Sequence, residues 1–511
     1  MVAMLIGGLL VALVMALPVS AGPKPCPQLT KSGGGDTLGS SGPGILNPCP
    51  GGLVWLTYFG SAQNEYGHKV GVDAIGNIYV GAFTTGGLPT TAGAYDTSFN
   101  GGSDVWVGKF DRNLTTLIWG TYLGGPGTDS PYGMAVDTNG DVYLSGKAGG
   151  GFPATSGAYD TSHNGGDDGF VARIDPTGAF LLYSSYLGGS EIDYSYGGLV
   201  LESPGIVYVT GLTYSTDFPT TPGAFDTSFN GDPAAGGDAF VSKLSLQGAG
   251  AADLVYSTFL GGTAPGDDAG RGIAVQGGYA YVVGETKSSD FPTTPDAFDQ
   301  TFGGGPGADG FLVKIDHLGG GLVYATFLGG TGSDTVWDVA VDGAGLAHVT
   351  GSTDSTGFPT TLGAWDRTRS GTDAFVTKFN AVGSGLAYST FLGGKSLDSG
   401  RGIRIAADGS AFISGYTQSS NFPVTADAYD ATYNGGQDAF LTRLSAAGSG
   451  LVYSTVLGGS GEETNYGAIA IDANERVHLS GRTQSSNFPT SSGAYDTTYN
   501  GGWDGFIAAL D

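Results

Sequence analysis

The sequence predicts an all-β fold, and three observations lead to this prediction. The same text, with substitutions, occurs seven times, in units that start at Leu53, Leu117, Leu181, Leu254, Leu322, Leu386 and Leu451. Each unit has four short runs rich in β-branched and aromatic residues, separated by glycine or Asx turns. No helical period of useful length follows residue 21. Four-stranded sheets repeated seven times predict a seven-bladed β-propeller of antiparallel blades.

The four runs of a unit are clearest in the sixth copy, where they cover 386–391, 402–406, 411–415 and 439–444. The second and third runs are joined by a tight turn, such as VDTNGD in the second unit, which is typical of a β-hairpin. The fourth run is joined to the first run of the next unit by turns such as AAGSG. This connection predicts a second hairpin and, with the first, one four-stranded sheet per unit.

The phase of the repeat predicts how the ring closes. The repeated text opens at Leu53 with LVWLTYFG and ends at Asp511 with GFIAALD. If a blade consists of the second, third and fourth runs of one unit plus the first run of the next, the seventh blade lacks its outer strand. Residues 53–59 would supply that strand by pairing with residues 505–510. This pairing would leave no open blade edge at the seam.

The residues before the first unit predict export. Residues 1–21 are an apolar run without a charged side chain, and Val19 and Ala21 suit the −3 and −1 places of a signal cleavage site. The alternative is an uncleaved anchor, but the run is shorter than the ~20 residues that span a bilayer. Residues 22–52 are a Pro/Gly/Ser-rich linker that holds Cys26 and Cys49, which we expect to form a disulfide in an exported protein.

Charge limits the classes of partner. The chain has 20 basic and 47 acidic residues and a formal net charge of −27. Such a surface repels phosphate backbones, which argues against nucleic acid as a partner. The same surface favours cations, so Ca²⁺ is the one cofactor that the composition suggests.

Three features recur in every unit or nearly so. A connector of about 25 residues carries a fixed proline and an aromatic-Asp pair, which predicts a compact plug on one face of the ring. We expect the basic residues of the fourth strand to be structural partners of the repeated aspartates that precede that strand. We expect those aspartates to cap local backbone, with metal ligation as the alternative: Asp104, Asp168, Asp238, Asp309, Asp373, Asp438 and Asp504.

The loop between the first and second runs holds the candidate site. Its acids are candidate calcium ligands: Asp129, Asp193, Asp268, Asp334, Asp398 and Glu463, with Gln63 in the first unit. Its candidate ligand-binding residues are Tyr66, Tyr132, Tyr196, Arg271, Trp337, Arg401 and Tyr466. If the second run is the innermost strand, these side chains ring one mouth of the central channel. Acids and aromatics there suit a sugar or a cation. The alternative is that each acid caps its turn and each ring packs on the next blade.

The recurring strings YSTFLGG, GIAV, FPTTPGAF and GGDAFV resemble the SBBP-type β-propeller repeat of bacterial exported and cell-surface proteins. All seven units match, so the resemblance covers residues 53–511. It implies a seven-bladed propeller and a setting outside the cytoplasm. It implies no catalytic residue.

Three functions remain open from the sequence. The first is a secreted or cell-surface, non-catalytic binding or scaffold module, whose ligand at the channel mouth is a glycan or a surface protein. The second is an assembly protein that polymerises by exchange of residues 53–59 between molecules. The third is a polysaccharide-active enzyme that uses a carboxylate pair.

Overall fold

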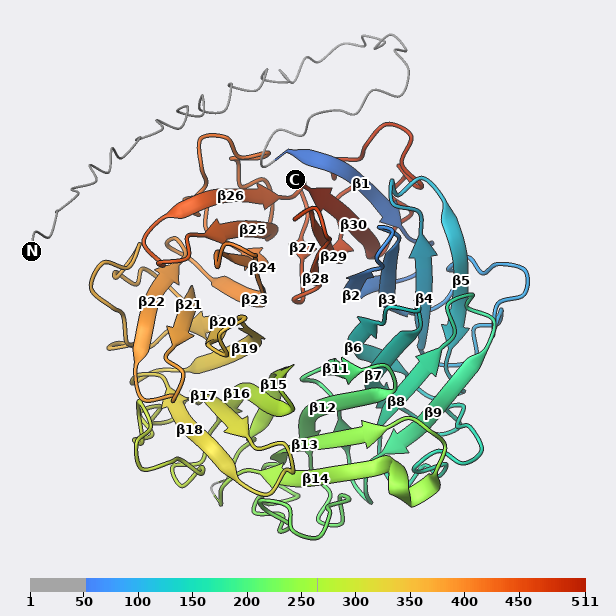
Figure 1. Ribbon diagram of the computed structural model, residues 1–511. Coiled ribbons are helices and arrows are strands. Elements are labelled where there is room, and N and C mark those ends of the chain that lie inside the picture. The colour runs from blue at the N-terminus through green and yellow to red at the C-terminus, as the bar shows by residue number, and fades with distance from the viewer. Residues whose placement is uncertain (1–51, 264) are drawn as a thin grey trace, which may run out of the picture. The chain divides into compact units, whose positions relative to one another are not determined.

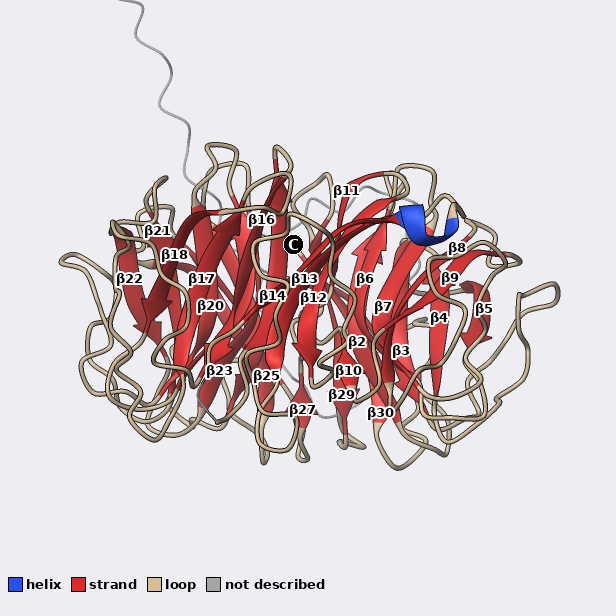
Figure 2. Cartoon of the chain, turned by 90° about the horizontal axis from the view of Figure 1, so that it is seen from below, coloured by secondary structure: helices blue, strands red, loops and turns tan. Residues whose placement is uncertain are grey.

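The computed structural model describes residues 52–511 except residue 264. These residues form seven antiparallel β-sheets arranged around one axis, which confirms the predicted seven-bladed β-propeller (Figure 1). Seen from the side, the strands run across the thickness of a disc and the loops cover its two faces (Figure 2). The predicted signal peptide (1–21), residues 22–51 of the predicted linker, and Cys26 and Cys49 lie outside the described residues.

Blades 1 to 3 contain these strands, from the axis outward (Figure 1). Blade 1 comprises β2 (Glu65–Val72), β3 (Ile78–Thr84), β4 (Asp104–Phe110) and β5 (Leu117–Leu123). Blade 2 comprises β6 (Ser130–Val136), β7 (Val142–Ala148), β8 (Asp168–Ile174) and β9 (Leu181–Leu187). Blade 3 has an inner strand in two parts, β10 (Asp193–Tyr194) and β11 (Leu199–Ser203), then β12 (Ile206–Thr213), β13 (Asp238–Ser245) and β14 (Leu254–Leu260), preceded by the short 3-10 helix η1 (Gly250–Asp253).

Blades 4 to 6 repeat the same order. Blade 4 comprises β15 (Ala269–Gln276), β16 (Tyr279–Thr286), β17 (Asp309–Ile315) and β18 (Leu322–Leu328). Blade 5 comprises β19 (Asp334–Val341), β20 (Ala347–Thr353), β21 (Asp373–Phe379) and β22 (Leu386–Leu392). Blade 6 comprises β23 (Asp398–Ile405), β24 (Ala411–Thr417), β25 (Asp438–Leu444) and β26 (Leu451–Leu457).

Blade 7 joins the two ends of the described chain. Its inner strand is split into β27 (Glu463–Thr464) and β28 (Ile469–Ile471), followed by β29 (Val477–Thr483), β30 (Asp504–Leu510) and, outermost, β1 (Leu53–Phe59). β1 pairs antiparallel with β30 in a register that sets Leu53 opposite Leu510 and Phe59 opposite Gly505. The predicted closure between residues 53–59 and 505–510 is therefore confirmed.

The core is divided among the blade interfaces. Seven clusters of buried apolar side chains occur, and each contains residues of two neighbouring blades. Strand β1 contributes to two of them, since Leu56 and Tyr58 pack in the cluster between blades 6 and 7 while Phe59 packs in the cluster between blades 7 and 1. Both interfaces of blade 7 therefore depend on this strand.

The inner hairpins of blades 1, 2, 5 and 7 are closed by Asx turns. In the turn between β2 and β3, the Asp73 carboxylate accepts the backbone N–H groups of Ile75 (3.1 Å) and Asn77 (2.8 Å). Gly76 in this turn has φ +90°, a conformation that glycine adopts without steric cost. The repeated Asp-x-x-Gly text of these turns therefore has a local structural cause.

The long connectors do not form the predicted plug on one face of the ring. In blade 1, the Thr91 N–H donates to the Gly120 carbonyl (3.1 Å), and the Tyr122 N–H donates to the Asp96 carbonyl (3.0 Å), so the connector lies along β5. The Tyr95 N–H then donates to the carbonyl of Gly178 in blade 2 (2.8 Å). The connector is thus held by the outer strand, whose free hydrogen-bonding groups would otherwise form an open edge.

We expect Leu56→Ala to lower the free energy of unfolding by about 2–5 kcal/mol, because it opens a cavity in a cluster that closes the ring. Leu56 is fully buried. The matched control is Leu362→Ala, at a side chain that is 88% exposed, where we expect a change within about 0.5 kcal/mol. Denaturant unfolding measures both values. Equal losses for the two variants would contradict the role assigned to β1.

Candidate functional site

All seven blades contribute side chains to one cavity. Its volume is about 420 Å³, and its lining includes residues of β2, β6, β15, β19 and β23 and residues next to the split inner strands of blades 3 and 7. Since the innermost strands surround the axis (Figure 1), a cavity that all of them line lies on that axis. We call it the central cavity.

An irregularity in each innermost strand provides one side chain to this cavity. In blades 1, 2, 4, 5 and 6 the register shifts at one extra residue, as at Tyr132 between Pro131 and Gly133. In blades 3 and 7 the strand is interrupted at the same place. A β-bulge bends a strand and redirects a side chain. The residues at these places are His68, Tyr132, Tyr196, Arg271, Trp337, Arg401 and Tyr466, and we call them the girdle.

The girdle residues contact one another around the axis. His68 stacks on Tyr466 and meets Tyr132 edge-on, both at 5.6 Å between ring centroids. The Tyr132 and Tyr196 rings are 4.6 Å apart. The remaining contacts place cations on rings, with Arg271 over Tyr196 (5.6 Å) and Trp337 (5.1 Å) and Arg401 over Trp337 (3.6 Å). The girdle is therefore a nearly continuous band of aromatic and cationic groups.

All seven residues predicted to ring the channel mouth line the central cavity: Tyr66, Tyr132, Tyr196, Arg271, Trp337, Arg401 and Tyr466. That they contact a ligand stays a prediction. In the first unit the bulge holds His68 and not the predicted Tyr66, which precedes it on β2 and stacks on Phe83 at 5.0 Å. The sequence contains a signal for His68, since every girdle residue stands three positions after an acid, and in the first unit that acid is Glu65.

The acids of these loops lie outside the cavity lining. Asp129, Asp193, Asp268, Asp334, Asp398 and Glu463 are buried, and Glu65, not Gln63, is their counterpart in blade 1. Each accepts a backbone N–H from its own loop, as from Gly125 to Asp129 (2.8 Å) and from Gly459 to Glu463 (2.7 Å). In blades 3 to 7 a serine hydroxyl of the following connector also donates to the acid. This geometry favours the alternative in which each acid caps its turn.

Calcium binding by these acids stays a prediction. Among the residues that the structure describes, no three His, Cys, Asp or Glu side chains are grouped as metal ligands.

The described residues also include no helix with the length and apolar character needed to cross a membrane.

The aspartates before the fourth strands cap backbone as predicted. Asp104 accepts the N–H of Asn100 (2.8 Å), and the equivalent bond occurs in every blade. Each lies next to the loop acid of the following blade. At Gly124, Gly188, Gly329 and Gly393, an added Cβ would touch both carboxyl groups of the pair. Burial raises the pKa of both acids of such a pair, to about 6 for Asp104 of blade 1 and about 7 for Asp129 of blade 2. Pairs of buried carboxyl groups thus occur where the chain passes from one blade to the next.

The basic residues of the fourth strands have different partners from those predicted. Lys109 pairs with Asp73 (3.5 Å), Lys378 with Asp342 (3.0 Å), and Arg173, Lys243 and Arg443 likewise with acids of the inner hairpins. The aspartates at the start of the same strands are too far along the strand to reach. Four of these five basic side chains, all except Lys378, also lie over aromatic rings of the neighbouring strand, as Lys109 lies over Tyr79 at 4.8 Å.

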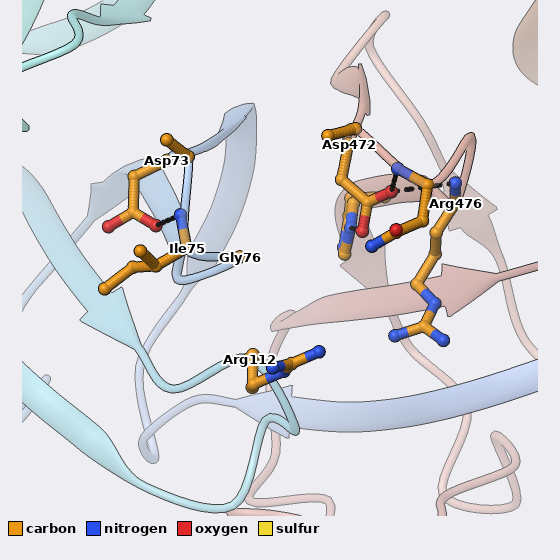
Figure 3. Close-up of a pocket in the computed structure, with 10 residues that line it drawn as sticks. Asp73, Ile75, Gly76, Arg112, Asp472 and Arg476 are labelled. Carbon is orange, nitrogen blue, oxygen red and sulfur yellow. Dashed lines mark hydrogen bonds and ion pairs between the residues drawn. The ribbon is translucent and has the colours of Figure 1, made fainter. Parts of the chain in front are cut away.

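A second cavity, of about 320 Å³, lies between the inner hairpins of blades 1 and 7. Figure 3 shows the turn at Asp73 and Gly76 facing the turn at Asp472 and Arg476, with Arg112 beside them. Asp472 accepts the backbone N–H groups of Asn474 (2.8 Å) and Arg476 (3.0 Å), so its carboxylate is bonded within its own turn. We therefore place the candidate site at the central cavity.

Comparison with known families supports the resemblance seen in the sequence. The model of the SBBP β-propeller repeat matches residues 118–153, from β5 to the connector after β7. The chain is also 31% identical over 151 residues to the regulatory protein FlaEY of Caulobacter vibrioides. That match covers 25% of this chain and 16% of the length of the relative.

Similar solved structures include both enzymes and proteins without assigned activity. A Dyadobacter fermentans protein of unknown function is 12% identical, with 90% of this chain and 99% of that chain covered and a TM-score of 0.40. A polysaccharide lyase of family PL25, an ulvan lyase, is 11% identical, with coverage of 83% and 92% and a TM-score of 0.45. At these identities and scores the likeness carries no argument about activity.

We expect Gly329→Ala to destabilise the protein by about 1–3 kcal/mol, because the added methyl group would overpack the carboxyl pair that joins blades 4 and 5. A Cβ at Gly329 would lie 2.6 Å from an oxygen of Asp309 and 2.8 Å from an oxygen of Asp334. Gly343→Ala, where no atom lies within 4 Å of the added Cβ, is the control. Chemical unfolding compares the two. If both variants are as stable as the parent chain, the carboxyl pair does not require glycine.

We expect the melting temperature to rise when the pH falls from about 7 towards 4. The pKa of each paired acid is raised by burial above its unfolded value of 3.8 or 4.5, so the folded state binds protons more tightly. Their contribution to stability is full below the unfolded pKa and is lost as the pH rises through the folded pKa. Buried His68 and His348, whose pKa values burial lowers to about 3 and about 4, act in the opposite direction but are fewer.

Thermal unfolding across this pH range measures the effect. Asp129→Asn should flatten the dependence on pH, whereas Asp427→Asn, at an exposed acid, should leave it unchanged. A melting temperature that falls steadily from pH 7 to pH 4 in the parent chain would contradict the assignment.

Proposed function

Since the chain carries an SBBP β-propeller repeat and folds as a seven-bladed propeller, we propose that it is a secreted or cell-surface binding module without catalytic activity. The apolar run of residues 1–21 and the exported setting of the resembling repeats support the location. The ring supports a role in binding, because seven rigid blades hold one variable side chain each at the same place. Fold alone does not assign a ligand, so the ligand class is argued from the central cavity.

The ligand that we propose is a carbohydrate, bound in the central cavity. The observation that carries this proposal is the girdle, in which five rings and two guanidinium groups from seven different blades face one space. Aromatic faces stack on the apolar faces of sugar rings, and nearby polar groups bond the hydroxyls. Ser130 and the tyrosine hydroxyls of the lining are available for that second role.

A carbohydrate-cleaving enzyme has less support. Acid–base cleavage of a glycosidic bond uses two carboxyl groups on either side of that bond. Asp338 is the one acid among the residues that line the central cavity, and its carboxylate pairs with Arg404 (2.9 Å) and accepts the N–H of Ile403 (2.9 Å). The paired carboxyls of the blades are buried away from this space. A catalytic pair is therefore lacking in the lining, which favours the binding role.

The alternative of assembly by strand exchange has no supporting observation either. β1 completes blade 7 of its own chain and leaves no site for a strand from another molecule. Exchange would require the ring to open and lose contacts at both interfaces of blade 7. We therefore retain the binding module as the proposed function.

We expect Trp337→Ala and Tyr466→Ala each to weaken binding of oligosaccharides by about tenfold or more, because each removes a stacking surface of the cavity; tenfold corresponds to about 1.4 kcal/mol. Isothermal titration calorimetry with a panel of neutral and acidic oligosaccharides would identify a ligand for the parent chain and then measure both variants.

The control is Tyr429→Ala, at a ring that is 39% exposed on an outer connector, far from the cavity in the fold. Its affinity should equal that of the parent chain. Unchanged affinity in both cavity variants would exclude the central cavity as the carbohydrate site. Failure of the whole panel to bind would count against carbohydrate as the ligand class.

A further inference from the structure

The central cavity is basic, although the chain as a whole is strongly acidic. Its lining contains five of the 20 basic residues of the chain, from Lys69 in β2 to Arg482 in β29. The one acid of the lining, Asp338, is engaged by Arg404. The net charge of the chain is −27, so most of its charged residues are acidic, yet the charged residues that line the central cavity are mostly basic.

Some of these cations are neutralised and others are not. Lys147 pairs with Asp167 (2.9 Å), and Arg271 pairs with Glu285 (2.5 Å). In the part of the chain that the structure describes, Lys69, Arg401 and Arg482 have no carboxylate within 4.0 Å. Burial lowers the pKa of both Lys69 and Arg401, but a guanidinium keeps its proton in proteins whereas a buried ammonium group loses it more readily. Arg401 and Arg482 therefore stand out as the two strongly basic groups without a counter-ion.

Both arginines are held by aromatic rings. The guanidinium of Arg482 lies 3.9 Å from the ring centroid of Trp503, 4.4 Å from that of Tyr66 and 5.1 Å from that of Tyr466. The guanidinium of Arg401 lies 3.6 Å from the Trp337 centroid and donates to the Tyr416 hydroxyl (2.7 Å). The Nε atoms of both arginines are buried and have no hydrogen-bond partner among the described residues. Each guanidinium is thus fixed in place with an unused donor.

Two buried guanidinium groups without counter-ions lower the stability of the folded state unless a bound anion pairs with them. Removing a cation from water carries a large penalty, and contacts with aromatic faces return only part of it. A guanidinium fixed by stacking presents its donors in a planar fork that matches a carboxylate or a sulfate. Rings that pack on a guanidinium and also face the cavity can contact the sugar that carries such a group.

We propose that the central cavity binds an anionic oligosaccharide, whose carboxylate or sulfate group is held by Arg401 and Arg482 while its sugar rings lie against the girdle. This inference rests on the proposed function and narrows its ligand class. The two sources of the anionic group, uronic acids and sulfated sugars, share the same recognition chemistry. A neutral glycan would leave both arginines without a counter-ion.

The test uses the full chain and three pairs of probes in titration calorimetry. The first pair is an oligogalacturonate and its methyl ester, in which each carboxylate is replaced by an uncharged ester that is larger by one methyl group. The second is a sulfated galactan oligosaccharide and its desulfated form. The third is a neutral xylo-oligosaccharide and its counterpart with a glucuronate branch. We expect the charged member of at least one pair to bind about tenfold or more tightly than its neutral partner, and the advantage to shrink as salt is added.

Arg401→Met and Arg482→Met test the residues themselves. Methionine keeps most of the apolar contact of the arginine stem and removes the charge. Each variant should lower affinity for the charged probe by about tenfold or more. The melting temperature of each variant should stay the same or rise, because the substitution removes a buried, unpaired cation that destabilises the folded state. Arg443→Met, at an arginine of β25 that pairs with Asp408, is the control and should bind like the parent chain.

The outcomes separate the two proposals. Equal binding of charged and neutral partners would overturn the anionic inference and leave the carbohydrate site standing. If no probe binds at all, both proposals fail. Unchanged affinity together with a lower melting temperature in the Arg401 and Arg482 variants would show that these arginines are structural, which would also overturn the inference.

Discussion

The antiparallel pairing of β1 with β30 is the interaction on which the rest of the structure depends. These strands come from opposite ends of the described chain, and they pair from Leu53 with Leu510 to Phe59 with Gly505, with one irregularity at Val54. The central cavity depends on the same contact, because Tyr66 and His68 stand on blade 1 whereas Tyr466 and Arg482 stand on blade 7. The candidate site is therefore complete only in the closed ring.

The fold could be predicted from the sequence because its information is repeated. Seven copies of one text fix the number of blades, and the offset between Leu53 and Asp511 fixes which strands close the ring. The girdle was predicted at six of seven places for the same reason. In the first unit, Tyr66 stands beside a glycine as the other predicted residues do, and only the three-residue spacing from the acid Glu65 identifies His68 as the residue in the bulge.

Other features depend on distances that a sequence does not contain. The loop acids are polar and recur beside aromatic residues, yet Asp129 and Glu463 face inward to their own loops and not the cavity. The partners of Lys109 and Lys378 follow from the register of the hairpins, which sets these side chains beside the turn acids Asp73 and Asp342. The positive charge of the cavity was not visible either, because its cations are spread along the chain from residue 69 to residue 482.

Each unit of the sequence is displaced by one strand from the blade that it helps to build, so its first strand belongs to the preceding blade. The outer strand of every blade is thus supplied by the next copy, and the last blade draws on the first. If a whole copy is gained or lost, the first strand of the first copy can still pair with the last strand of the last copy. The number of blades, and with it the width of the space on the axis, can therefore change during evolution without a new device for closure.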